Sequence, residues 1–422
     1  MGDSGDGGPA EARPVILRRL RAAAGSVPWL GAICVLAALV AAAALRLTLL
    51  DFKSVDYYSS LKPWYNVIQS QGFSAFGTGF SNYNPPYLYL LYLVIRLFPG
   101  APIVVAAKLP ALMADLVCAA LVFLIVRSRA GGRLALPLVA GGAILLAPTV
   151  VLNSAFWGQA DSLYTAGILG WTYFMMRRRP GWAMACFGIS LAFKLQAIFL
   201  TPLIIALTLK GSIPWKTLLL VPAILALALV PAWAAGRPIL ELLSIYAGQT
   251  AQYESLTMMA ASAYTWLPGS KQVFNLFYVP GLLMGLSMAL LWCYVMYKSP
   301  RTGPGRLILE LALITMLVFP FFLPKMHERY FYPADVLSIA FAFMYPELFF
   351  VPIIMVATSF VSYQPFLFER ELLPFPVLTL VLLALIALLV YHALRQLYGQ
   401  SDLESKAGPP SSENAAAEGT VS

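Results

Sequence analysis

Long apolar runs separated by short polar segments make up most of the chain. The first run extends from about Trp29 to Leu50, and further runs of similar length follow up to about residue 396. An apolar helix of about 20 residues is long enough to cross the hydrocarbon core of a bilayer. The alternation of apolar and polar residues that marks membrane strands is absent. The pattern therefore predicts an all-α polytopic membrane protein whose first helix is an uncleaved span.

Basic clusters between the apolar runs predict which loops face the cytoplasm, because Lys and Arg are enriched in cytoplasmic loops. In chain order the clusters are Arg13 with Arg18, Arg19 and Arg21; Arg127, Arg129 and Arg133; Arg177, Arg178 and Arg179; Lys210 and Lys216; Lys298, Arg301 and Arg306; and Arg395 with Lys406. Placing every cluster inside gives about 12 spans with both termini in the cytoplasm.

Two segments do not fit a simple series of crossings. If the helical run Pro86–Phe98 crossed the membrane, the next basic cluster would face outside. We therefore expect it to be an interfacial helix in a long first extracytoplasmic loop, about 51–107, where its tyrosines suit the membrane boundary. The runs 182–193 and 197–209 are short for two crossings, which predicts a broken hairpin that lines a cavity.

Composition leaves little room for a separate soluble domain. The 422 residues are 60% hydrophobic and 11% charged, whereas soluble proteins carry about 25% charged residues. The net charge of +9 is accounted for by the loop clusters, so no nucleic-acid partner is predicted. We expect a membrane domain over 29–396 between disordered cytoplasmic tails at 1–28 and 397–422. The four cysteines all lie in apolar runs and are interpreted as packing residues.

Four short polar motifs interrupt the apolar pattern on the predicted outer side. They are Asp51–Asp56 with the tyrosine that follows, Asn82–Pro86, Asn153–Asp161 and Lys325–Tyr330. Ionisable groups at a membrane boundary are costly unless a function retains them. Their shared side predicts one active site that faces away from the cytoplasm.

The first two motifs supply an acid and an amide. Asp56 follows the first span closely, and a carboxylate there would remove a proton from a sugar or lipid hydroxyl. Asp51 is the alternative base, and a solvated boundary acid would explain either residue. Asn82 precedes Pro85 and Pro86, which suit a first helical turn, so Asn82 either lines the site or only precedes a helix.

The third motif has side chains that suit a sugar. Trp157 would stack on a sugar face, while Gln159 and Asp161 would hydrogen-bond hydroxyl groups. Asp161 has a second interpretation, because an acid is also favoured at the start of the next helix.

The fourth motif contains three consecutive ionisable residues, His327, Glu328 and Arg329. Arg329 with His327 would bind a phosphate, because a guanidinium offers a planar fork of donors. Glu328 is assigned to the substrate site. Lys194, which interrupts the broken hairpin, is either a further phosphate contact or a lysine that extends to the membrane surface.

No cofactor is predicted. A glycine-rich loop of the Walker or dinucleotide-binding type is not evident, which favours a lipid-linked donor over a nucleotide. Asp51 and Asp56 are five residues apart and do not form an Asp-x-Asp pair, so a metal site is not supported.

The ordered set of motifs from about 29 to 345 resembles the GT-C glycosyltransferases. The set comprises Asp56-Tyr, the Pro-Trp-Tyr and Asn-Tyr-Asn-Pro-Pro sequences, Lys108 with Asp115, Trp-Gly-Gln-x-Asp, Phe-Lys-Leu-Gln and His-Glu-Arg-Tyr. It is most similar to bacterial mannosyltransferases related to the second mannosyltransferase of GPI-anchor assembly. It also resembles the endoplasmic-reticulum glucosyltransferases that extend lipid-linked oligosaccharide, which have Lys where this chain has Arg329.

The resemblance implies an inverting enzyme that moves a hexose, mannose first, from a polyprenyl-phosphate sugar. It assigns the base to Asp56 and the donor phosphate to the region 327–329. The acceptor would be a lipid-linked species, a glycan or a protein at the outer face of a bacterial plasma membrane. A transporter or lipid flippase remains the alternative, and a structural membrane subunit is a third.

Overall fold

The computed structural model describes residues 28–132, 134–251, 253–301 and 305–399. Residues 1–27 and 400–422, with nearly all of the two predicted tails, lie outside the described residues. The longer helices are α2 (Pro28–Leu49), α3 (Lys62–Gln71), α4 (Pro85–Leu97), α5 (Ile103–Arg127), α6 (Ala135–Leu146), α7 (Pro148–Val151), α8 (Asp161–Met176), α9 (Pro180–Phe193), α10 (Thr201–Leu209), α11 (Leu220–Ala234), α12 (Ile239–Ala251), α13 (Lys271–Lys298), α14 (Arg306–Phe322), α15 (Tyr332–Met344), α16 (Val351–Phe368) and α17 (Phe375–Tyr398). Two strands of two residues each, β1 (Thr257–Met258) and β2 (Met326–His327), complete the main elements.

The helices confirm an all-α polytopic membrane fold. Within the described part of the chain, five helical segments are long and apolar enough to cross a membrane: Ile103–Arg127, Trp215–Ala234, Lys271–Lys298, Pro346–Phe368 and Phe375–Tyr398. A sixth results if α6 and the segment Pro148–Trp157, bent by 49°, form one span. Because most of the other helices are shorter than the roughly 20 residues a crossing needs, the number of about 12 spans stays a prediction.

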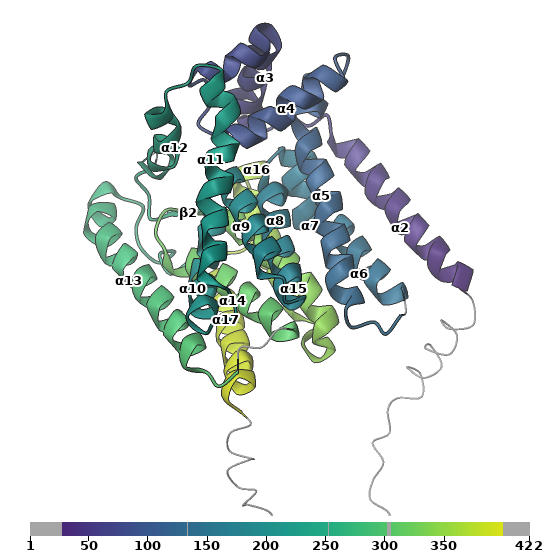
Figure 1. Ribbon diagram of the computed structural model, residues 1–422, viewed down its shortest axis with the longest axis vertical. Helices are drawn as coiled ribbons and strands as arrows, with labels where there is room; N and C mark the ends of the chain where they lie inside the picture. The colour runs from purple at the N-terminus through teal and green to yellow at the C-terminus, as the bar shows by residue number, and fades with distance from the viewer. Residues whose placement is uncertain (1–27, 133, 252, 302–304, 400–422) are drawn as a thin grey trace, which may run out of the picture.

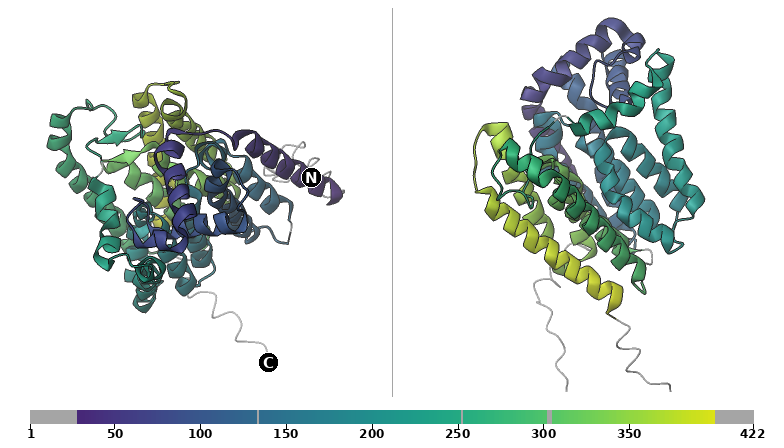
Figure 2. Two further views of the ribbon diagram at one scale, coloured as in Figure 1. Left: turned by 90° about the horizontal axis from the view of Figure 1, so that it is seen from above. Right: turned by 90° about the vertical axis from the view of Figure 1, so that its left-hand side faces the viewer.

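Different helices lie at the two ends of the helical bundle (Figure 1). α2 begins and α17 ends at the lower end of the molecule, whereas α3 and α4 lie at the opposite end. Figure 2 shows the same separation from a second side. The side of the membrane on which each of these ends lies stays a prediction. α4 also confirms the helix expected at 86–98, and Pro85 and Pro86 form its first turn.

The core lies around α14 and α15, which are apolar on nearly all sides and buried in the bundle. A helix that is hydrophobic all round is expected to be surrounded by other helices. The loop between these two helices carries β2 and the His327–Arg329 motif. β2 pairs in parallel with β1, and the backbone N–H of Lys325 donates to the carbonyl of Leu256 at 2.8 Å. The rigid core and this pairing together fix the motif in place.

A buried lysine fixes the start of the segment that carries Asp56. The Lys108 ammonium, on α5, donates to the carbonyls of Leu50 at 2.8 Å and Phe52 at 2.7 Å. Carbonyls at a helix end lack partners within the helix, so Lys108 satisfies the end of α2. Asp115, seven residues further along α5, pairs instead with Arg46 of α2 at 2.9 Å.

Candidate functional site

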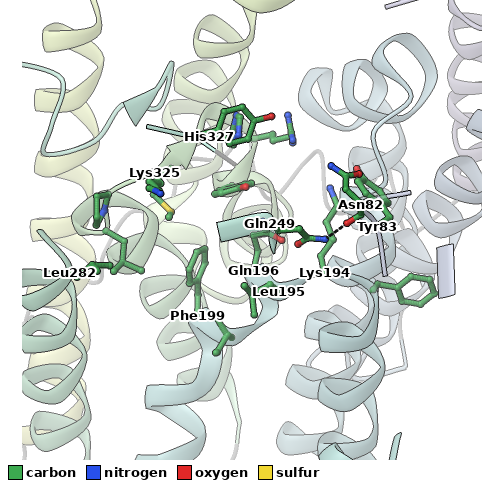
Figure 3. A pocket seen from close by; sticks show the side chains of 18 of the residues that line it. Asn82, Tyr83, Lys194, Leu195, Gln196, Phe199, Gln249, Leu282, Lys325 and His327 are labelled. Carbon is green, nitrogen blue, oxygen red and sulfur yellow. Dashed lines mark hydrogen bonds between the residues drawn. The ribbon is translucent and has the colours of Figure 1, made fainter. Parts of the chain in front are cut away.

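Two neighbouring cavities bring the polar motifs together. The polar cavity, about 400 Å³, is lined by Asp56, Ser59, Ser60, Leu61, Trp64, Asn82, Tyr83, Gly158, Gln159, Tyr253 and Arg329. The cationic cavity, about 270 Å³, is lined by Lys194, Gln196, Lys325, His327 and Tyr330 together with many apolar side chains. Asn82, Tyr83, Tyr253 and Arg329 line both cavities. Figure 3 shows the cationic cavity, with Lys194, Asn82 and Tyr83 on one side and Lys325 and His327 on the other.

Asp56 is held by two side chains from the third motif. Its Oδ2 accepts hydrogen bonds from Trp157 Nε1 at 2.7 Å and from Gln159 Nε2 at 2.6 Å. The Gln159 amide oxygen in turn accepts from the Tyr83 hydroxyl at 3.3 Å. Within the described residues Oδ1 of Asp56 accepts no hydrogen bond. One carboxylate oxygen is therefore fixed in position, and the other is available to accept a proton.

Local backbone geometry positions this group of side chains. Asp56 precedes a π-helical turn at Tyr57–Leu61, and a second π-helical turn, Leu152–Trp157, ends at Trp157. Such turns are rare and frequently occur at functional sites. Gly158 follows with a φ of +84°, and a Cβ atom there would lie 3.0 Å from Leu61. Any other side chain would be strained at this position, and the turn at Gly158 directs the chain so that Gln159 reaches Asp56.

A buried aspartate holds the cations of the second cavity. Asp161 is the first residue of α8 and is fully buried. Its Oδ1 accepts a hydrogen bond from Lys194 Nζ at 2.6 Å, and its Oδ2 accepts one from Asn153 Nδ2 at 2.8 Å. Arg329 Nε lies 4.0 Å from Oδ2. Lys194 breaks the chain between α9 and the 3₁₀ turn Leu195–Leu200, which agrees with the predicted interruption of the hairpin.

Arg329 is the cation common to both cavities. Its Nη1 lies 3.7 Å from the buried Glu328 carboxylate, and its guanidinium lies 5.5 Å from the centre of the Trp157 ring. Its Nε is buried and has no hydrogen-bond partner among the described residues. Buried polar groups are nearly always hydrogen-bonded, so this donor is suited to an anionic ligand.

The surroundings of His327 favour its neutral form. Burial lowers the pKa of its imidazole below the usual 6.5, and the neighbouring Arg329 acts in the same direction. The Tyr253 and Tyr330 rings pack edge-on against it, with centroids 5.1 and 5.2 Å away. A lowered pKa favours a neutral hydrogen-bonding group over a cationic partner for a phosphate.

Three residues predicted to contact substrate have other surroundings. Trp157 is fully buried and stacks on Phe366 with centroids 4.7 Å apart, so its ring cannot stack on a sugar. Asp161 and Glu328 are buried and line neither cavity; they lie beside the cations instead. Asp161 and Glu328 share a physical reason for this position, because a buried cation needs a buried acid beside it.

The two candidate bases differ in position. Asp51 is exposed and lines neither cavity, whereas Asp56 lines the polar cavity. Asn82 is exposed and lines both cavities. Its backbone carbonyl accepts a hydrogen bond from Gln249 Nε2 at 2.6 Å. Asn84, two residues later, is structural, because its amide donates to the carbonyl of Ala192 at 2.9 Å.

Several residues that line the cavities lie outside the motifs or were not singled out within them. Tyr253 comes from the loop after α12, and Ser59 and Ser60 come from the turn after Asp56. Tyr83 lies inside the Asn82–Pro86 motif, which was the available signal for it. No sequence pattern marks Tyr253, because only the three-dimensional fold brings the loop after α12 to β2. Among the described residues, no three His, Cys, Asp or Glu side chains form a group that would hold a metal ion.

We expect Asp161→Asn to destabilise the protein strongly. The amide keeps the volume but removes the charge that compensates Lys194, and breaking a buried pair typically costs about 3–5 kcal/mol. Thermal unfolding in detergent should show a clearly lower midpoint. Glu241→Gln is the control, since Glu241 is 45% exposed and pairs only locally with Arg237. Adding Lys194→Met to Asp161→Asn should restore part of the lost thermal stability. Equal midpoints for wild type and Asp161→Asn would contradict this role of Asp161.

The chain shows little similarity to known protein families, curated proteins or solved structures. No protein-family model matches the chain, and no curated protein matches it. Among solved structures, the crystal structure of ArnT from Cupriavidus metallidurans bound to undecaprenyl phosphate is similar, with 15% sequence identity and a TM-score of 0.46. The matched region covers 87% of this chain and 78% of that chain. The function of this chain therefore rests on the chemistry of its two cavities.

Proposed function

We propose that the protein is an inverting glycosyltransferase that moves a hexose, mannose first, from a polyprenyl-phosphate sugar to a hydroxyl group. One observation carries the proposal: Asp56 and Arg329 line the same polar cavity, and Arg329 continues into a cavity that also holds Lys194 and His327. An oriented carboxylate and a group of phosphate-binding side chains thus meet at one place. A glycosyl transfer with a phosphate leaving group needs both.

The proposed reaction uses each cavity for one partner. Oδ1 of Asp56 removes the proton from the acceptor hydroxyl as its oxygen attacks the anomeric carbon of the donor sugar. The bond from that carbon to the phosphate oxygen breaks, and the polyprenyl phosphate leaves as an anion. Arg329 and Lys194 stabilise the charge that develops on it, since fixed cations in a water-poor site act strongly there. His327 adds a neutral hydrogen bond.

The lining of the cationic cavity also suits a lipid. Phe199, Leu282 and Leu323 lie beside Lys325 and Gln196 in the same cavity. The first isoprene units of a polyprenyl phosphate would gain free energy from burial against such side chains. By the distribution of basic clusters, both cavities face the outer side of the membrane, which we propose to be a bacterial plasma membrane. The acceptor is a lipid-linked species, a glycan or a protein.

A donor panel tests this function. Purified full-length protein is mixed with a membrane-lipid extract and with polyprenyl phosphates that carry radiolabelled mannose, glucose or another hexose. We expect label to enter a product only in the presence of protein, with mannose transferred fastest. Transfer of another sugar would keep the mechanism and replace the donor. A folded protein that transfers no sugar from any such donor would contradict the proposal and favour a transporter.

The state of His327 predicts a pH effect on stability. Since folding favours the neutral imidazole, its contribution to stability is fully present above the usual pKa of 6.5 and is lost as the pH falls toward the lowered pKa. Between about pH 7.5 and about pH 5.5, the range in which histidine titrates, wild type should lose more thermal stability than His327→Gln. Parallel losses in the two proteins would show that His327 is not the group responsible.

A further inference from the structure

The α8–α9 hairpin has one end in the site and a second, charged end far from it. At its open end, Asp161 and Lys194 pair at 2.6 Å. α8 has 16 residues, and at a rise of 1.5 Å per residue its other end is about 24 Å away. The closed end is the turn Arg177–Arg179, which we call the arginine turn. It lies at the opposite end of α8 from Asp161.

The arginine turn lines a cavity of its own, about 410 Å³ in volume, together with Tyr173, Phe174, Met176 and Trp182. No acidic residue lines this cavity. All three arginines are exposed. Their side chains have no hydrogen bond, ion pair or aromatic partner within the described parts of the chain. Three positive charges therefore border one hollow without compensation.

The backbone conformation of the turn disfavours an arginine at its central position. The N–H of Arg179 donates to the carbonyl of Phe174 at 2.8 Å, and that of Arg178 donates to Met175 at 3.0 Å. This is the pattern that closes a helix with a left-handed residue, usually glycine. Here that residue is Arg178, with a φ of 55°. A bulky side chain in this conformation is disfavoured, and such residues tend to persist where a function retains them.

An aromatic pair stands beside the charges. Trp182 is 62% exposed and stacks on Phe174, with ring centroids 6.0 Å apart and an angle of 28° between the rings. Exposed tryptophans are typical of the interface between headgroups and acyl chains. Guanidinium groups next to such an aromatic pair provide both a phosphate-binding and a chain-binding surface.

We propose that the arginine turn binds the phosphate group of an anionic membrane phospholipid. Arg177 and Arg179 would pair with the phosphate oxygens through their planar forks of donors. The acyl chains would run along Trp182 and the lipid-facing side of α9. Basic pockets at the cytoplasmic ends of membrane helices are known to recognise such headgroups. This inference does not depend on the proposed glycosyl transfer.

Lipid titration of the full-length protein tests the proposal. Purified protein in detergent is titrated with phosphatidylglycerol, and bound lipid is counted by native mass spectrometry alongside the thermal midpoint. Phosphatidylcholine and inorganic phosphate are titrated in parallel. We expect phosphatidylglycerol to bind and raise the midpoint, and neither of the other probes to do so. Stabilisation by inorganic phosphate alone, with no added effect of the lipid, would overturn the assignment to a lipid.

A matched pair of double variants separates this site from general surface charge. Arg177→Gln/Arg179→Gln should weaken phosphatidylglycerol binding about 25-fold, because each cation near an anionic lipid contributes roughly fivefold. Arg127→Gln/Arg395→Gln removes the same charge from the ends of α5 and α17, where both arginines are exposed. It should leave the affinity nearly unchanged. Equal losses in the two double variants, or no loss in the first, would overturn the proposal.

Discussion

Replacing Asp56 with asparagine should lower the rate of sugar transfer by about 10²–10⁴-fold, the usual contribution of general base catalysis. The amide keeps the shape of the carboxylate but cannot accept the proton of the acceptor hydroxyl. Oδ2 of Asp56 accepts hydrogen bonds from Trp157 and Gln159, and an amide oxygen can still accept both. We therefore expect a folded protein that binds the donor normally and transfers its sugar very slowly.

Asp51→Asn is the matched control for this substitution. Asp51 is an acid of the same motif, but it is exposed and lines neither cavity. Its replacement should leave transfer within a few-fold of wild type. Full activity in Asp56→Asn, or a loss confined to Asp51→Asn, would show that the base has been assigned to the wrong residue.

Replacing Arg329 with glutamine should reduce transfer by about 10²–10³-fold, the typical cost of removing one donor that stabilises developing negative charge. Arg329 lines both cavities, and its Nε has no hydrogen-bond partner among the described residues. Its loss should therefore weaken binding of polyprenyl phosphate as well as slow the reaction. Equilibrium binding of labelled polyprenyl phosphate, measured beside the transfer rate, separates the two effects.

Two further variants show whether the effect is specific. Arg329→Lys keeps the charge without the planar fork and should recover only part of the affinity. Arg46→Gln removes another partly buried arginine that pairs with a buried acid, Asp115, outside both cavities. It should lower stability without changing donor affinity. If Arg46→Gln and Arg329→Gln weakened donor binding equally, the effect of Arg329 would be structural.

Much of the fold follows from local sequence signals. Apolar runs of about 20 residues and paired prolines at Pro85 and Pro86 predict helices directly, because length and backbone geometry are local properties. The break at Lys194 was likewise evident from a polar residue between two short apolar runs. The number of crossings was harder to predict. α15 has only 13 residues and is buried by neighbouring helices. Its apolar sequence reflects that burial, so hydropathy alone cannot distinguish it from a helix that crosses the membrane.

The sequence selects the polar motifs that line the two cavities, but it does not show which of their side chains contact each other. The motifs of Asp56 and Gln159 were both selected, but the hydrogen bond between these residues joins positions 103 residues apart. No local pattern reveals such a pairing. Asp161 and Trp157 were expected to face a sugar because of their chemistry. Their burial beside Lys194 and Phe366 depends on packing that the sequence does not display.

In the proposed mechanism the two cavities form one active site, in which Asp56 acts on an acceptor while Arg329 holds the donor phosphate. A single-turnover experiment tests it most directly. Purified wild type and Asp56→Asn are saturated with radiolabelled polyprenyl-phosphate mannose, and bound and transferred label are followed after a membrane-lipid extract is added. We expect equal bound label in the two proteins and rapid transfer only in wild type. Transfer at the same rate by both proteins, or no binding of this donor by folded wild type, would contradict it.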